Sequence, residues 1–150
     1  MPHLLVVHHT TSPATQELLE AALAGTRAEG LDAVQVQVRP ALAATLVDLL
    51  AADGLVLGTP ANIGYMSGAL KTFFDLVYYP ALTAKAGAPY GLYVHGNSDT
   101  GGAVRAVEAI AKGMGWQRVA EPVTVIGMPD RAALDRVWNL AATVAATLLG

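Results

Sequence analysis

The chain has 150 residues, of which 53% are hydrophobic and 14% are charged, and its net charge is −3 at pH 7. This composition excludes a disordered chain, and the lack of a long basic run argues against nucleic acid or an anionic membrane surface as a partner. Cysteine is absent, which excludes disulfides, cysteine-based zinc sites, Fe–S clusters and thiol nucleophiles.

The first residues carry no basic segment followed by a long apolar one, so they do not predict a signal peptide. Every apolar run is interrupted by Gly, Pro or a charge before it reaches the roughly 20 residues that a membrane span needs. We therefore expect a cytoplasmic protein without membrane segments. The length is typical of one domain, and we expect a single domain over residues 1–150.

In the first part of the chain, β-branched runs alternate with helical patterns rich in Ala and Leu. The apolar run at residues 4–7 predicts a strand that is covered on both faces, and residues 14–29 predict an amphipathic helix. Strict alternation at residues 34–38 predicts a strand at a sheet edge. Pro40 fits the first turn of a helix that carries Leu42, Leu46, Leu49 and Leu50.

The same alternation continues to the end of the chain. Strands are predicted at 54–58, at 91–94 and within 119–126, and helices at 70–77 and around 104–111. Asp130 is predicted to cap a last helix, with Leu134, Val137, Trp138, Ala141, Val144 and Leu148 facing inward. Strands that alternate with helices predict right-handed crossovers and a mainly parallel α/β sheet in three layers.

Ligands of such sheets bind outside the carboxyl ends of the strands, so the loops there are the candidate sites. After the first strand, Thr10-Thr11-Ser12-Pro13-Ala14-Thr15 supplies four hydroxyl groups at the start of a helix. Hydroxyls and free helical N–H groups bind phosphate without a cation, although a plain Ser-Pro helix start has the same local pattern. Ser12 is the predicted cap and Pro13 the first helical residue.

The loop after the third strand carries a more specific pattern. It reads Gly58-Thr59-Pro60, has Gly64 four residues past the proline, and leads to Lys71-Thr72-Phe73-Phe74-Asp75. This pattern resembles the flavodoxin superfamily, and more closely its branch of NAD(P)H-dependent FMN and quinone reductases. The first loop is similar to the family's phosphate signature, except that Pro13 stands where glycine is usual. The resemblance implies a flavodoxin-like three-layer sandwich whose five-stranded parallel sheet has the order 2-1-3-4-5.

After the fourth strand, the segment His95–Gly102 resembles the family's second flavin loop. Its adjacent glycines would allow the backbone to approach a flat ring closely, although an ordinary glycine-rich turn looks similar. The resemblance implies FMN as cofactor and NAD(P)H as co-substrate. The cofactor-binding residues that it implies are Thr10, Thr11, Ser12, Pro13, Ala14 and Thr15, then Pro60, Ala61, Asn62, Ile63 and Gly64, then His95, Gly96, Asn97, Ser98, Gly101 and Gly102.

Other sites that this topology supports are not favoured by the sequence. Neither G-x-G-x-x-G nor G-x-x-x-x-G-K-[ST] occurs, and the acidic residues of a phospho-receiver domain are missing. Gly96-x-Ser98-x-Thr100 lacks the last glycine of a nucleophile elbow, and no histidine follows it in the chain. We expect the four histidines to be structural or to support a ligand site indirectly, and we expect no metal site, because the adjacent His8 and His9 should point to opposite faces.

The resemblance implies an oxidoreductase in which FMN carries the chemistry and no side chain is a required acid or base. Hydride would pass from NAD(P)H through the flavin to a quinone, a flavin or a similar small acceptor. The alternatives are a flavodoxin-type electron carrier and a binding domain that keeps the fold without flavin. Many reductases of this kind are dimers or tetramers, and the candidate contact surfaces are Tyr78-Tyr79-Pro80 and the pair Tyr65 and Met66.

Overall fold

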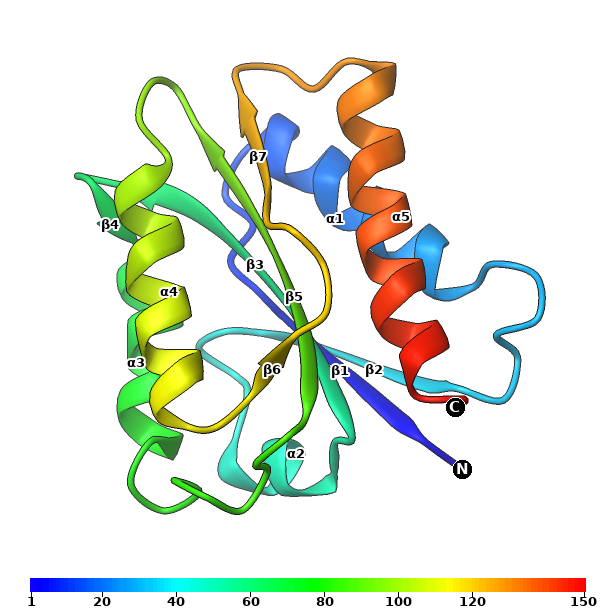
Figure 1. The fold of residues 1–150 in the computed structure, drawn as a ribbon. Coiled ribbons are helices and arrows are strands. Elements are labelled where there is room, and N and C mark those ends of the chain that lie inside the picture. The colour runs from blue at the N-terminus through cyan, green and yellow to red at the C-terminus, as the bar shows by residue number, and fades with distance from the viewer.

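The computed structural model describes residues 1–150 and has one central sheet with helices on both faces (Figure 1). Its parallel strands are β1 (His3–His8), β2 (Gln35–Pro40), β3 (Gly54–Asn62), β5 (Pro89–Gly96), β6 (Gln117–Arg118) and β7 (Val123–Ile126). They follow the order β2-β1-β3-β5-β6, and β7 also pairs with β5. Because β6 and β7 together take the place of the fifth strand, the predicted order 2-1-3-4-5 is confirmed.

The helices divide between the two faces of the sheet (Figure 1). They are α1 (Pro13–Thr26), α2 (Leu46–Ala51), α3 (Gly68–Val77), α4 (Gly101–Gly113) and α5 (Arg131–Thr147). Alternate residues of β1 enter different cores: Leu5 and Val7 face α2, α3 and α4, whereas Leu4 and Val6 face α1 and α5. This explains why residues 4–7 are continuously apolar. None of the helices has the length and apolarity needed to cross a bilayer.

Two helix starts agree with the sequence. Ser12 is the N-cap of α1, with Pro13 in the first helical position, and the side chain of Asp130 accepts the N–H of Ala133 to cap α5. The start of α2 does not agree. Pro40 ends β2, and α2 begins at Leu46 because Thr45 and Asp48 form a reciprocal capping box that Pro40 cannot offer. As a result, Leu42 lies outside the helix and is exposed.

The strand predicted within residues 119–126 is present as β7, and one further prediction, for Trp138, is wrong. The fifth strand is interrupted between β6 and β7, where Pro122 has no N–H to donate to the ladder. Trp138 does not face inward: 37% of its surface is exposed. Val137, Ala141 and Val144 form the buried stripe of α5, and Trp138 lies one residue, or about 100°, round the helix from that stripe.

The segment 59–68, predicted as a loop, is largely a β-hairpin. Strand β3 continues to Asn62, and β4 (Tyr65–Met66) pairs with it antiparallel, Asn62 opposite Tyr65. The two residues between them, Ile63 and Gly64, have φ values of 50° and 73°. Two successive positive φ values are the signature of a type I′ turn, which joins antiparallel strands with the correct twist. We call residues 61–66 the β3–β4 hairpin.

Candidate cofactor site

A cavity of about 330 Å³ lies at the carboxyl edge of the sheet. This edge is the upper one in Figure 1, where β5 and β7 end and α1 begins. The cavity is lined by Thr11, Ser12, Pro13, Ala14, Pro60, Asn62, His95, Asn97, Gly127 and Met128. All three predicted loops therefore contribute to one site, and its volume falls in the range of small-molecule sites.

In the first loop, Ser12 and Thr15 hold each other in a capping box. The Thr15 hydroxyl oxygen accepts the N–H groups of Thr11 (3.0 Å) and Ser12 (2.9 Å), and Ser12 Oγ accepts the N–H of Thr15 (3.1 Å). Thr15 is only 2% exposed. Its hydroxyl therefore fixes the path of the loop and does not line the cavity.

Thr10 is not among the residues that line the cavity, and its Oγ1 is 2.8 Å from Nδ1 of His8. Burial, and to a smaller extent the nearby charge of His9, lowers the pKa of His8 below its ordinary value. The imidazole is therefore neutral near pH 7 and adds no positive charge to the loop.

The groups that remain free in this loop are neutral donors. The backbone N–H of Ala14, at the start of α1, makes no hydrogen bond within the chain, and neither does the Thr11 hydroxyl. Both residues line the cavity. A helix N-terminus with a free N–H and an adjacent hydroxyl suits a phosphate group, so these residues fit the phosphate end of FMN.

In the second loop, Pro60 and Asn62 line the cavity, whereas Ala61, Ile63 and Gly64 do not. The buried hydroxyl of Thr59 anchors the base of the β3–β4 hairpin: it accepts the Ser67 N–H (3.0 Å) and donates to the Pro60 carbonyl (2.8 Å). Ile63 is fully exposed at the hairpin tip.

In the third loop, His95 and Asn97 line the cavity, and Gly96, Ser98, Gly101 and Gly102 do not. Gly101 and Gly102 were predicted in a loop but lie in the first turn of α4. A Cβ atom on Gly102 would be 1.9 Å from the carbonyl oxygen of Gly64. The structure therefore gives Gly102 a role within the protein, which is to let α4 touch the β3–β4 hairpin.

Sequence reasoning missed Gly127 and Met128, which follow β7 and complete the cavity wall. The carbonyl oxygen of Gly127 is 2.9 Å from Nε2 of His95, and its N–H donates to the Gly96 carbonyl (3.0 Å). The rule that selected the other loops applies here too, since Gly127-Met128-Pro129-Asp130 is the loop after the last strand.

The electrostatics of the cavity are those of a neutral site. Its lining residues include no Lys, Arg, Asp or Glu, and His95 is the only ionisable side chain among them. The cavity therefore offers two asparagine amides, a neutral anion-binding helix start and apolar surface from Pro60 and Met128. These groups fit a flat ring with polar edges that carries a phosphate.

Comparisons with known proteins agree with this arrangement. The family model described as NADPH-dependent FMN reductase matches residues 30–128, a segment that includes every cavity residue except those of the first loop. A flavodoxin from Aquifex aeolicus (strain VF5) is 36% identical over 75 residues, which are 50% of this chain and 40% of that protein. The chain thus spans less than half the length of this curated relative.

Solved structures show the same fold at low sequence identity. A flavodoxin from the domain Archaea has a TM-score of 0.82 and 21% identity, with 99% of both chains covered. The WrbA-like flavodoxin from Agrobacterium tumefaciens has a TM-score of 0.79 and 19% identity, covering 99% of this chain and 98% of that one. The fold is therefore flavodoxin-like, and because the family model covers most of the sequence, the chain belongs to the NADPH-dependent FMN reductase family.

Proposed function

We propose that the protein is an FMN-dependent reductase that accepts hydride from NAD(P)H and passes electrons to a quinone, a flavin or a similar small acceptor. The observation that carries the proposal is the single cavity that joins the loops after β1, β3, β5 and β7. Bound FMN would supply the redox chemistry, and the protein would supply placement and electrostatics. Family membership supports FMN as the flavin.

Each wall of the cavity has a distinct task in this proposal. The Thr11 hydroxyl and the Ala14 N–H would hold the phosphate. Asn62 and Asn97 would offer amide groups to the polar edge of the ring, because both line the cavity, one from each of two loops. His95 is fixed by its contact with the Gly127 carbonyl, so its ring can keep one orientation beside the flavin.

The reductase proposal is supported by the lack of large aromatic side chains in the cavity wall. No Phe, Tyr or Trp side chain lines it, and none occurs between Asn97 and Gly102. One face of the flavin ring would therefore have room for a nicotinamide or a quinone. The protein needs no acid or base of its own for hydride transfer.

A flavodoxin-type electron carrier is the second candidate, favoured by the likeness to the Aquifex aeolicus flavodoxin. A carrier that docks on basic redox partners relies on a strong negative field to steer the encounter. The net charge of −3 is a weak field for this purpose. The balance of these observations supports the reductase.

Anaerobic stopped-flow mixing of the FMN-loaded protein with NADH or NADPH separates the two. A reductase is expected to lose its flavin absorbance rapidly with at least one nicotinamide and no added enzyme. If neither nicotinamide reduces the flavin, while a chemical reductant does so in separate one-electron steps, the protein is a carrier. Tighter binding of FAD than of FMN by the apoprotein, or no flavin binding, contradicts both.

Variants of the third loop provide a matched pair for the same experiment. Asn97→Tyr places an aromatic ring at the cavity wall and is expected to slow reduction by the nicotinamide while FMN stays bound. Ser98→Tyr adds the same ring one residue further on, where the side chain does not line the cavity, and is expected to leave the rate unchanged. Equal rates of flavin reduction in the original protein and in both variants would show that the open face of the ring lies elsewhere.

A further inference from the structure

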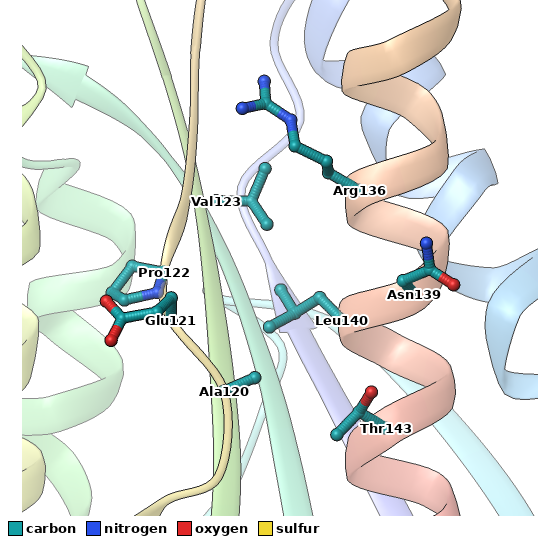
Figure 2. A pocket seen from close by; sticks show the side chains of 8 residues that line it. All are labelled: Ala120, Glu121, Pro122, Val123, Arg136, Asn139, Leu140 and Thr143. Atoms are coloured by element: carbon teal, nitrogen blue, oxygen red, sulfur yellow. The ribbon is translucent and has the colours of Figure 1, made fainter.

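A second cavity, of about 380 Å³, lies between α5 and the connection from β6 to β7 (Figure 2). We call it the α5 groove. Val123 and Leu140 give it an apolar floor, and Arg136, Asn139 and Thr143 give it polar groups. It shares no residue with the candidate cofactor cavity, so it is a separate feature of the surface.

The polar side chains of α5 in this groove are all unpartnered. Arg136, Asn139 and Thr143 are spaced three and four residues apart, so they lie along one face of the helix. Their side chains make no hydrogen bond or ion pair within the chain, whereas the nearby Arg131 pairs with Asp135 at 3.3 Å. Figure 2 shows the guanidinium of Arg136 extending from α5 toward β7.

The opposite wall adds donors but no free negative charge. The backbone N–H groups of Ala120 and Glu121 make no hydrogen bond within the chain, because the strand is interrupted there. In Figure 2 the carboxylate of Glu121 points away from α5, and it pairs with Arg118 at 3.2 Å. The groove therefore combines an unpaired guanidinium with an apolar floor, and two residues of its wall have unbonded backbone N–H groups.

We propose that the α5 groove binds the phosphorylated adenosine end of NADPH; this inference rests on the proposed reductase function. A planar guanidinium can form paired hydrogen bonds with a phosphate, and Arg commonly accommodates the 2′-phosphate that distinguishes NADPH from NADH. The apolar floor suits the adenine ring. Arg136 is thus the residue that would set the preference between the two nicotinamides.

The position of the groove along β7 is compatible with one ligand reaching both cavities. Val123 lines the groove and Gly127 lines the cofactor cavity, four residues further along the same segment. At the rise of an extended strand this separation is about 13 Å. An extended dinucleotide, with two riboses and a pyrophosphate, covers such a span. Val125 lies between the two cavities on the same face of β7 and is buried, so the connecting pyrophosphate would run along the outer edge of β7, beside the exposed Thr124 and Ile126.

Binding of 2′,5′-ADP and of 5′-AMP to the FMN-loaded protein, measured by calorimetry, tests the proposal without turnover. We expect 2′,5′-ADP to bind at least about tenfold more tightly, since a hydrogen bond to a charged group is worth that much or more. Arg136→Gln should reduce this affinity roughly ten- to hundredfold and leave that of 5′-AMP almost unchanged. Arg131→Gln, which removes an ion-paired arginine on the same helix, should change neither.

Steady-state kinetics give a second readout, since Arg136→Gln should raise the KM for NADPH but not for NADH. The proposal would be overturned if the protein bound the two nucleotides with equal affinity, or if Arg136→Gln bound 2′,5′-ADP as tightly as the original protein does. It would also be overturned if inorganic phosphate bound as tightly as 2′,5′-ADP. If NADPH still reduces FMN in those cases, the site fails and the reductase function stands. If neither nicotinamide reduces bound FMN, the proposed function itself fails, and with it this assignment.

Discussion

Hydroxyl groups of the first loop divide into two sets that look alike in the sequence. The hydroxyl of Thr15 is buried and bonded to the backbone of Thr11 and Ser12, so it stabilises the loop itself. The hydroxyl of Thr11 makes no hydrogen bond within the chain and lines the cavity, so it is free to meet a ligand. Only the second kind can discriminate between ligands without affecting the fold.

We therefore expect Thr11→Ala to weaken FMN binding about tenfold or more, because a hydrogen bond to a charged phosphate is lost. Riboflavin, which has no phosphate, should bind to this variant as it does to the original protein. Fluorescence titration of the apoprotein with each flavin measures both affinities. Equal losses for the two ligands would show that Thr11 does not contact phosphate.

Thr15→Ala is the comparison within the same loop. It removes a capping interaction and should lower the free energy of unfolding by about 0.5–2 kcal/mol. It should weaken the binding of FMN and of riboflavin by similar factors, because the whole loop becomes less ordered. An effect on FMN alone would mean that Thr15 leaves its capping position and contacts the phosphate.

At the scale of elements, the β3–β4 hairpin and the start of α4 depend on each other. The carbonyl oxygen of Gly64, at the hairpin turn, lies where a side chain of Gly102 would begin. This contact joins the hairpin to the first turn of α4, and the segments on either side of it supply Asn62 and Asn97 to the same cavity. Residues that are distant in the sequence therefore set the width of the site.

Gly102→Ala is expected to destabilise the protein by about 1–3 kcal/mol, since the new Cβ would overlap a backbone carbonyl and force the hairpin to move. Flavin affinity should fall with it. Urea unfolding and flavin titration measure the two effects. Gly101→Ala is the control: its Cβ would meet only the flexible end of Arg105 and the carboxylate of Asp99, at 3.0 and 3.3 Å. If Gly101→Ala lost as much stability as Gly102→Ala, the loss would come from helix geometry and not from the hairpin contact.

At the scale of the molecule, one sheet separates two hydrophobic cores. Leu5, Leu57 and Leu92 face one core, and Leu4, Val56 and Tyr93 face the other, so each of β1, β3 and β5 contributes to both. The two tryptophans are divided in the same way. Trp116 is buried beside Phe74 and Tyr90 in the first core, and Trp138 lies on α5 above the second. Shared strands should make the two layers unfold together.

Single-tryptophan variants test this expectation of one cooperative domain. In Trp138→Phe the remaining fluorescence reports on the core beside α3 and α4, and in Trp116→Phe it reports on the layer of α1 and α5. Within each variant, the urea transition followed by fluorescence should coincide with the transition followed by far-UV circular dichroism. Separate midpoints in either variant would indicate two units that unfold independently.

The sequence alone was sufficient for the architecture because the hydrophobic pattern is nearly continuous in the strands and periodic in the helices. Residues 4–7 predicted a strand covered on both faces, and the alternation at 34–38 predicted an edge strand, which is where β2 lies. Local chemistry also predicted the caps Ser12 and Asp130. Where two local signals competed, as at Pro40 and Thr45, the sequence offered no way to rank them, and the complete capping box at Thr45 was the stronger.

The position of the site could also be predicted, because parallel strands bring their carboxyl ends to one edge whatever the loops contain. Which loop residues line the cavity was decided only by tertiary structure. Thr15 turned inward because two backbone N–H groups needed an acceptor, and Gly102 serves a contact with the hairpin. The α5 groove arises where an interrupted strand meets a helix from a later part of the chain. Such contacts depend on the distances between elements, and local patterns of residues carry no information about those distances.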